Sequence, residues 1–417
     1  MIYDFDTPVD RSNTNSLKWN VKENELPMWV ADMDFKAAPE ILDAIQARAA
    51  HGVFGYTEIP DAWYEAYIGW WESRHGFRME KDWLIFCTGI VPAISSMVRK
   101  LTTPAEKVLV QTPVYNIFFN SIMNNGRQVL ESPLVYDGET YHMDFADLEE
   151  KLADPQTSLM ILCNPQNPAG NLWDRGTLAR IGDLCKKYHV TVISDEIHCD
   201  LTSPGYEYIP FASVSDTCRE ISVTCLAPTK TFNLAGLQTA AVSVPDETLR
   251  HRVWRGLNTD EVAEPNAFAV NAAVAAFTKG APWLDELRVY IEENKKTVTE
   301  YAAEHMPQLH VVPSKATYLM WLDCGAWVNA AHKNSQHSGS GSADTDGSAN
   351  AKKESACPEQ TDLAEFIREK TGLYVSSGSA YGGNGAQFLR MNVACPHSLV
   401  LDGMQRLKKG LAGFGAF

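Results

Sequence analysis

The sequence lacks three features that would place the chain in a membrane or in an oxidising compartment. No stretch approaches the roughly 18 apolar residues that a transmembrane helix needs. Residues 1–6 (MIYDFD) have neither the basic start nor the apolar region of a signal peptide. The nine cysteines are odd in number and form no Cys-x-x-Cys pair, which favours reduced thiols over disulfides or structural zinc. We therefore expect a cytoplasmic protein with no bound metal and no membrane contact.

Positive charge is also scarce. The 36 lysines and arginines face 52 acidic residues, which gives a net charge of -16 and an isoelectric point of about 5.1. Nucleic acids and anionic membranes attract basic patches, so neither is an expected partner. With 417 residues, 45% of them hydrophobic, the chain is long enough for two or three domains with a sizeable core.

The middle of the chain alternates short apolar segments with amphipathic helical ones such as Asp174–Tyr188. The apolar segments do not alternate polar with apolar residues, which is typical of strands buried on both faces. This order predicts an α/β domain with a largely parallel sheet, whose ligands gather at the carboxyl ends of the strands. The predicted strands are Lys107–Gln111, Ser158–Cys163, Val190–Ser194, Ile221–Cys225 and Thr239–Val244.

The C-terminal part mixes strand-like and helix-like segments in a looser order, which predicts a smaller α+β domain. We expect an N-terminal segment (1–45) that joins this small domain, a large domain (46–285) and the small domain itself (286–417). Within the small domain, Asn334–Gln360 is rich in Ser, Gly, Asp and Asn and has almost nothing apolar. It cannot bury enough surface to offset its ordering entropy, so we predict a flexible insert. A passive insertion is favoured over a binding role.

A doubled Asn-Pro motif follows one of the predicted strands. Residues 164–170 (NPQNPAG) come directly after the apolar run that ends at Cys163. Proline stops helix and strand alike, so the amide side chains of Asn164 and Asn167 are held on a stiff turn at a strand end. A plain turn would use the same residue types. The doubled form is more specific and favours a binding site.

Two ionisable residues occupy equivalent positions after the next strands. Asp195 ends the strand at Val190–Ser194, where it could cap a helix or face a cationic ligand nitrogen. Lys230 follows the strand Ile221–Cys225 among apolar and small residues, where burial would depress its pKa and make the amine nucleophilic. An exposed structural lysine is the alternative. The hydroxyls of Thr229 and Thr231 favour a phosphate-anchored cofactor.

Two further positions could hold anions. Gly89 separates an apolar strand from a helix that starts near Ile90 and Val91, and free N–H groups at a helix start can bind phosphate. Arg390 lies in the apolar strand Gln387–Asn392, where it needs an anion. A substrate carboxylate gripped by the guanidinium fork would serve, and a structural ion pair would serve as well.

Taken together, these motifs resemble the class I/II aminotransferase family of pyridoxal 5'-phosphate (PLP) enzymes, fold type I. The family order of an Asn-Pro motif, an acid, a lysine and an arginine is matched by Asn167, Asp195, Lys230 and Arg390. The resemblance covers essentially the whole chain except 334–360. Its MalY/PatB-type cystathionine β-lyase (C–S lyase) branch resembles this chain at residues 29–35 (WVADMDF), 54–57 (FGYT) and 195–198 (DEIH).

The resemblance implies a role for each site residue. Lys230 would hold PLP as a Schiff base and act as the catalytic base, and Arg390 would bind the α-carboxylate of an amino-acid substrate. The enzyme would be a homodimer, in which Tyr56 reaches the cofactor phosphate of the neighbouring subunit. The remaining cofactor contacts would be Asp195 to the pyridine nitrogen, Asn167 and His198 near the 3-hydroxyl, Tyr115 stacked on the ring, and Ile90, Val91 and Thr229 around the phosphate.

The implied activity is α,β-elimination from cystathionine or a cysteine-type substrate, giving a thiol, pyruvate and ammonia, with a place in methionine biosynthesis. Two alternatives stay open: an aminotransferase with the same residues, and a regulatory protein on the same scaffold. The regulator is disfavoured because such a protein should lose the lysine or its partners. The chain departs from the family at Thr229, usually Ser, and at Tyr381, usually Phe, which alters the pocket.

Overall fold

The computed structural model describes residues 2–338 and 362–414. Its largest sheet has seven strands in the order β2-β10-β9-β8-β7-β3-β4. Neighbouring strands are parallel except where β10 pairs with β2 and β9, so the predicted α/β class with a largely parallel sheet is confirmed. The strands are β2 (Leu84–Cys87), β3 (Lys107–Val110), β4 (Gln128–Glu131), β7 (Thr157–Cys163), β8 (Thr191–Asp195), β9 (Ser222–Leu226) and β10 (Ala240–Ser243).

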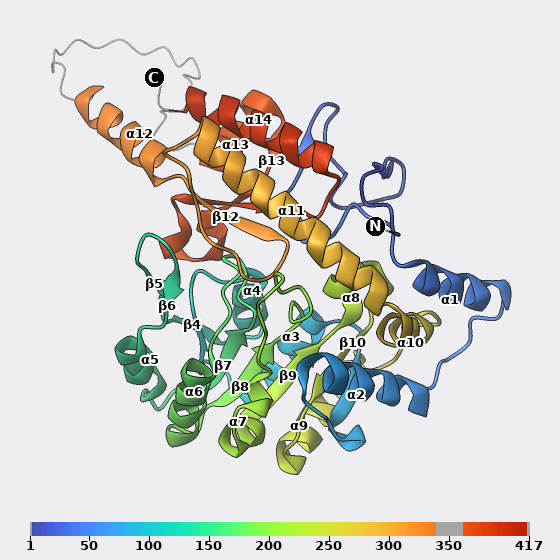
Figure 1. Cartoon of the computed structure of the whole chain (residues 1–417). Coiled ribbons are helices and arrows are strands. Elements are labelled where there is room, and N and C mark those ends of the chain that lie inside the picture. The colour runs from blue at the N-terminus through green and yellow to red at the C-terminus, as the bar shows by residue number, and fades with distance from the viewer. Residues whose placement is uncertain (1, 339–361, 415–417) are drawn as a thin grey trace, which may run out of the picture.

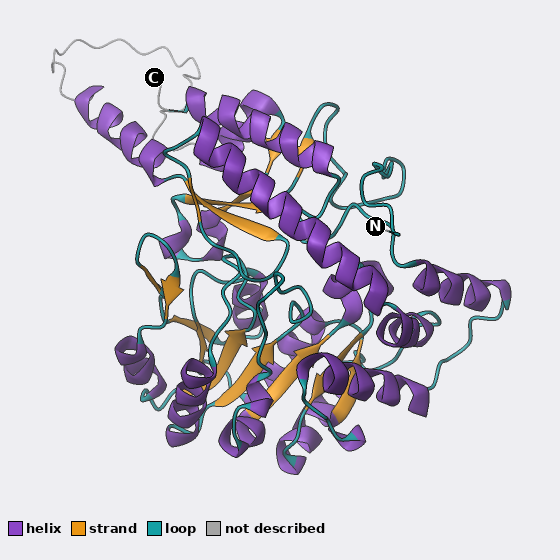
Figure 2. Cartoon of the chain, in the orientation of Figure 1, coloured by secondary structure: helices purple, strands orange, loops and turns teal. Residues whose placement is uncertain are grey.

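Helices bury this sheet on both faces (Figure 2). Val108 and Val110 pack in one cluster with residues of α3 (Ile90–Leu101) and α9 (Glu247–Thr259). Leu109, between them, packs in another cluster with α5 (Phe145–Leu152) and α6 (Arg175–Lys187). Successive side chains of a strand point to opposite faces, and both faces here are apolar, which explains the continuous apolar runs of the sequence.

A second, antiparallel sheet has the strand order β11-β12-β15-β14 and packs with α11, α13 and α14 around a separate core. The N-terminal segment contacts this part of the chain, because β1 (Leu26–Pro27) pairs in parallel with β13 (Leu373–Tyr374). The domain limits at 45 and 285 stay predictions. The elements are β11 (His310–Val311), β12 (Leu319–Asp323), β14 (Ser376–Ser377), β15 (Phe388–Asn392), α11 (Ala281–His305), α13 (Leu363–Thr371) and α14 (His397–Gly413).

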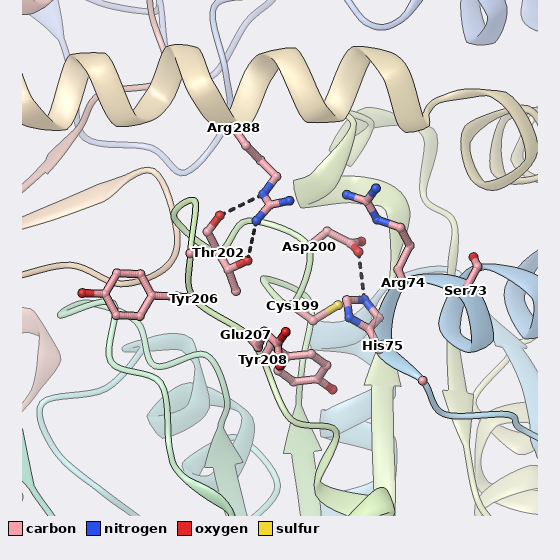
Figure 3. Close-up of a pocket in the computed structure, with 12 residues that line it drawn as sticks. Ser73, Arg74, His75, Cys199, Asp200, Thr202, Tyr206, Glu207, Tyr208 and Arg288 are labelled. Carbon is pink, nitrogen blue, oxygen red and sulfur yellow. Dashed lines mark hydrogen bonds and ion pairs between the residues drawn. The ribbon is translucent and has the colours of Figure 1, made fainter.

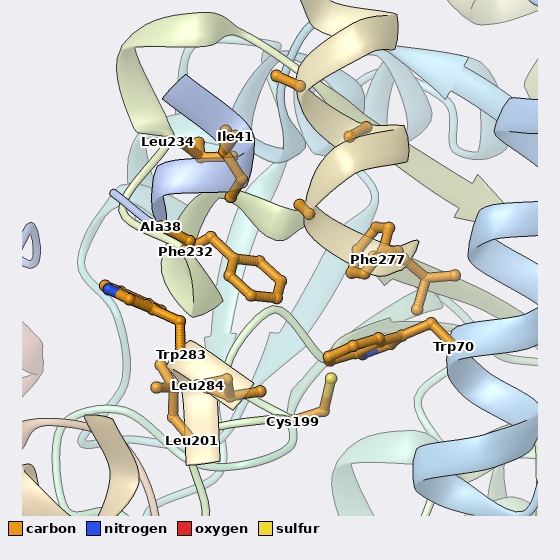
Figure 4. Close-up of a cluster of buried hydrophobic side chains, with 14 of the residues drawn as sticks. Ala38, Ile41, Trp70, Cys199, Leu201, Phe232, Leu234, Phe277, Trp283 and Leu284 are labelled. Atoms are coloured by element: carbon orange, nitrogen blue, oxygen red, sulfur yellow. The ribbon is translucent and has the colours of Figure 1, made fainter. Parts of the chain in front are cut away.

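The long helix α11 runs from the large sheet to the smaller one (Figure 1). Near its start, Trp283 joins an aromatic cluster with Trp70, Phe232 and Phe277 (Figure 4). The remaining elements are α1 (Pro39–Ala50), α2 (Asp61–His75), α4 (Ile117–Met123), α7 (Asp216–Ile221), α8 (Pro228–Thr231), α10 (Ala269–Lys279), α12 (Gly325–Ser338), β5 (Val135–Tyr136) and β6 (Tyr141–His142).

One predicted boundary is wrong. The insert was expected to begin at Asn334, but α12 continues through Asn334 to Ser338. Adding a residue to an existing helix costs far less than starting one, so a helix can extend into a polar stretch. The rest of the predicted insert lies outside the described residues. Within the described ranges, no helix has the length and apolar character needed to cross a bilayer.

Candidate active site

The predicted site residues follow strands that end at one edge of the large sheet. Strands β3, β7, β8 and β9 are parallel, and β2 shares their direction because both β2 and β9 are antiparallel to β10. Their carboxyl ends therefore meet at the same edge, where ligands of such sheets bind. The residues brought to this edge are Ile90 after β2, Tyr115 after β3, Asn167 after β7, Asp195 at the end of β8 and Lys230 after β9.

Lys230 lies on the four-residue helix α8 directly after β9. Its Nζ donates a hydrogen bond to the backbone oxygen of Ala31 at 2.7 Å. Burial lowers the pKa of Lys230 to about 8, opposed by the negative charges of Asp32 and Asp195 and assisted by the positive charge of Arg390. The amine is therefore far more often neutral near pH 7 than an exposed lysine is, as a nucleophile and base must be.

Asp195 is buried, and burial raises its pKa to about 7, with smaller opposing effects from the N–H of Ile197 and the charge of Lys230. A buried carboxylate in this state favours a cationic partner. His198 lies nearby with its pKa lowered to about 3 by burial and by Lys230 and Arg390. Its Nδ1 is buried and has no hydrogen-bond partner among residues 2–338 and 362–414. A bound molecule could therefore supply a cationic partner to Asp195 and a hydrogen bond to His198.

Arg390 is buried on β15 and reaches the same site from the smaller sheet. Its Nη1 donates to Oδ1 of Asn167 at 3.2 Å and its Nη2 to the backbone oxygen of Trp29 at 2.6 Å. The guanidinium carbon lies 5.0 Å from the centre of the Tyr381 ring. No carboxylate of the described residues forms an ion pair with Arg390, and its Nε has no partner there. The structural ion pair considered for this arginine is therefore absent from the described part, and the cation is available for a ligand.

The start of α3, predicted to hold an anion, also lies at this edge. Gly89 precedes α3, and no side chain caps the helix there. The N–H groups of Ile90 and Val91 belong to the first turn, where the backbone has no partner within the helix. Thr229 directly precedes Lys230 on the neighbouring turn. Thr231 differs from the prediction, because its hydroxyl donates to Asp200 at 2.9 Å and so is committed away from a phosphate.

A cavity of about 580 Å³ is lined by three of the predicted site residues, Tyr115, Lys230 and Arg390. Lys230 and Arg390 are two of its charged groups, and Tyr381 also lines it. Its other charged lining residues are Asp362, Glu365 and Arg368. Tyr115 lies close enough to Arg390 and Asp195 for their charges to influence its pKa, which burial raises. Tyr56 lies outside this cavity, fully exposed on the segment between α1 and α2. All predicted site residues except Tyr56 are thus associated with one edge of the large sheet.

The sequence did not predict that backbone carbonyls of the N-terminal segment bind the charged side chains of the site. The segment Trp29–Ala31 lines the cavity, and its carbonyls bind both site cations: Trp29 accepts from Arg390, and Ala31 accepts from Lys230. The hydroxyl of buried Tyr318 also donates to the Ala31 oxygen, at 2.9 Å. No side-chain pattern marks a carbonyl, and Tyr318 sits in an ordinary apolar strand-like run. The WVADMDF motif was the signal that pointed to the segment.

The comparisons with known proteins agree with this geometry. The family model for aminotransferases of class I and II matches residues 23–407. Cystathionine beta-lyase PatB of Bacillus subtilis is 39% identical over 98% of this chain and 100% of its own length. Protein MalY of Escherichia coli is 30% identical over 99% of this chain and 98% of its own.

A solved structure, the PLP-bound C–S lyase from Staphylococcus hominis, has a TM-score of 0.88 at 29% identity, covering 99% of both chains. The predicted fold type I is therefore confirmed. These matches extend over the whole site, from the N-terminal segment that lines the cavity to the strand that carries Arg390. The chain belongs to the aminotransferase class I and II family, within which it is similar to the PatB and MalY proteins.

Proposed function

We propose that this chain is a PLP-dependent carbon–sulfur lyase that cleaves cystathionine or a cysteine-type substrate by α,β-elimination, giving a thiol, pyruvate and ammonia. The observation that carries the proposal is Lys230, whose pKa burial lowers to about 8 and which lines a cavity together with Arg390, an arginine without an ion-pair partner among the described residues. The full-length similarity to a cystathionine beta-lyase supports the choice of reaction.

The residues present fit the cofactor. Asp195 favours a cation, which a protonated pyridine nitrogen provides, and the orphaned Nδ1 of His198 can meet a ring hydroxyl. The uncapped start of α3 suits a phosphate. In this assignment Lys230 holds PLP covalently, Asp195 pairs with the ring nitrogen, Asn167 and His198 bind the 3-hydroxyl, Tyr115 stacks on the ring, and Ile90, Val91 and Thr229 bind the phosphate.

Arg390 and Lys230 have separate roles in the proposed reaction. When bound, PLP holds the substrate amine and withdraws the electron pair left at Cα. Arg390 binds the α-carboxylate with its guanidinium fork and so orients Cα toward Lys230. The freed amine of Lys230 takes the Cα proton as a general base. The resulting ammonium hands a proton to the departing sulfur, which completes the elimination.

An aminotransferase is the second candidate, because the matching family model describes that reaction and the same residues serve it. The test supplies cystathionine without a keto acid and follows pyruvate and free thiol. Turnover over many cycles supports the lyase. One conversion per site, with turnover restored only by a keto acid, would identify an aminotransferase. A regulator without either activity is disfavoured by the presence of Lys230, Asp195 and Arg390.

We infer that the enzyme works as a homodimer. Val53 and Phe54 are 63% and 57% exposed and lie beside Tyr56 on an extended segment, and clustered exposed apolar residues mark interaction surfaces. Pairing would carry Tyr56 to the partner subunit's cofactor phosphate.

The dimer proposal is tested by mixing Tyr56→Phe chains with Lys230→Ala chains. If Tyr56 acts across the interface, each heterodimer has one site with both lesions and one intact site, so activity recovers. Verified heterodimers without recovery would count against it.

A further inference from the structure

A buried carboxylate lies directly behind the helix that carries Lys230. Asp200 accepts hydrogen bonds from the Nε1 of Trp70 and the Nε2 of His75 on one oxygen, and from the hydroxyl of Thr231 on the other, all at 2.9 Å. Burial raises its pKa, but the hydrogen bonds led by His75 outweigh burial, and the pKa lies below its ordinary value. Asp200 is therefore a buried anion at neutral pH. The three hydrogen bonds from Trp70, His75 and Thr231 are enough to stabilise the buried negative charge of Asp200, so no ligand is needed to explain it.

Thr231 connects this anion to the site, because it is the last residue of α8 and follows Lys230 directly. A single four-residue turn has little stability of its own, so its orientation depends on tertiary contacts. On one side, the side chain of Asn233 bonds the backbone of Met33 and Phe35 at 2.9 to 3.0 Å. On the other side, Asp200 holds the end of α8 by accepting a hydrogen bond from the Thr231 hydroxyl.

We propose that Asp200, oriented by His75, is a positioning residue that fixes α8 through Thr231 and so aims the Lys230 amine at the substrate Cα. The inference rests on the proposed lyase function, because it concerns the base of that reaction. Asp200 does not act by its charge on the amine: the charges that influence Lys230 are those of Asp32, Arg390 and Asp195. Its effect on Lys230 is geometric, and a misplacement of a catalytic group by about 1 Å can cost on the order of 100-fold in rate.

A second cavity beside His75 and Asp200 allows a small molecule added to the solution to reach these residues. It measures about 620 Å³, and His75 and Asp200 line it together with Arg74, Tyr208 and Arg288 (Figure 3). It shares no lining residue with the cavity at Lys230. The His75 ring stacks edge-on against Tyr208 with centres 5.0 Å apart. Imidazole can therefore reach the space that His75→Ala would leave.

The first experiment removes only the hydrogen bond between Thr231 and Asp200. Thr231→Val removes the hydroxyl at nearly constant volume, and Thr231→Ser keeps it. Thr224→Val is the matched control, because Thr224 lies on β9 and its buried hydroxyl has no hydrogen-bond partner in the described part of the chain. All variants are loaded with PLP, and rates are normalised to bound cofactor.

We expect Thr231→Val to lower kcat for cystathionine by roughly tenfold or more, with KM changed less than about threefold. The isotope effect from deuterium at Cα should rise, because proton removal by Lys230 becomes the slow step. Loss of folded protein alone cannot change an isotope effect. Without substrate, the pH midpoint of the colour change of Lys230-bound PLP should also move. Thr231→Ser should recover most of the loss, and Thr224→Val should behave like the wild type.

The second experiment uses His75→Ala. Its kcat should fall, and added imidazole should restore it several-fold, while imidazole leaves the wild type and Thr231→Val unchanged. An unchanged isotope effect and an unchanged colour midpoint in Thr231→Val would overturn the positioning role. A wild-type enzyme that fails to release thiol would refute the proposed function instead, and the colour midpoint would still test whether Asp200 acts on Lys230.

Discussion

Asp195 allows a test of the site that needs no substrate. Burial raises its pKa from 3.8 to about 7, so the folded apoprotein holds this proton more tightly than the unfolded chain does. Below about pH 4 the group is protonated in both states and carries no ionic cost. As the pH rises from about 4 to 7, the unfolded chain ionises first, and stability is lost. A pKa difference of this size corresponds to a loss of about 4 kcal/mol.

Asp195→Asn should remove that loss, because an amide does not titrate. The assay compares thermal unfolding midpoints of the apoproteins between about pH 5 and pH 8. The variant should become more stable relative to the wild type by several degrees across this range. Asp200→Asn is the matched control: the folded pKa of Asp200 is depressed, so its contribution changes only at lower pH. Parallel curves for Asp195→Asn and wild type would refute the assignment of Asp195 as a carboxylate whose burial outweighs the opposing charge of Lys230.

Three further predictions concern ligands and the insert. Borohydride should fix PLP to the peptide that contains Lys230, and a colourless wild-type protein that stays unlabelled in excess PLP would contradict the cofactor assignment. Arg390→Lys should lower kcat/KM by several tens-fold or more, about 2–3 kcal/mol, because an ammonium cannot copy the fork that reaches Asn167 and Trp29. PLP content should not change, and an unchanged kcat/KM would show that another group binds the carboxylate. Replacing 339–360 with a short Gly-Ser link should leave turnover and the unfolding midpoint nearly unchanged, and a large loss of either would show that the segment packs on the protein.

The sequence was most informative where strands end. The five predicted strands of the large sheet are present, each end within one residue of its predicted position, because the turn residues on either side of an apolar run limit where the strand can begin and end. The polar residues that follow them were predictable as a group, since parallel strands bring their carboxyl ends together. Their individual roles as cofactor ligands stay predictions.

Contacts from distant parts of the chain could not be predicted. Ala31 contributes only a carbonyl to the site, and no pattern in a sequence marks which carbonyl lies beside a lysine 199 positions away. The part played by Thr231 was misjudged for a similar reason: its partner Asp200 comes from another strand–turn unit, and the direction of a hydroxyl depends on packing. The end of α12 was missed because helix extension into a polar segment leaves no apolar period to detect.

The antiparallel strand β10 determines how far apart two parts of the candidate site lie. It separates β2 from β9, so the start of α3 and the turn that carries Lys230 stand two strand spacings apart, roughly 10 Å. Backbone hydrogen bonds between β10 and its two neighbours maintain this interval, so side-chain substitutions within the sheet should change it little. New specificities can therefore arise in the segments Trp29–Ala31 and Ser376–Tyr381, which contribute residues to the cavity wall, while the strands keep the proposed cofactor contacts at a constant separation. Redesign of the substrate preference should be directed at these two segments.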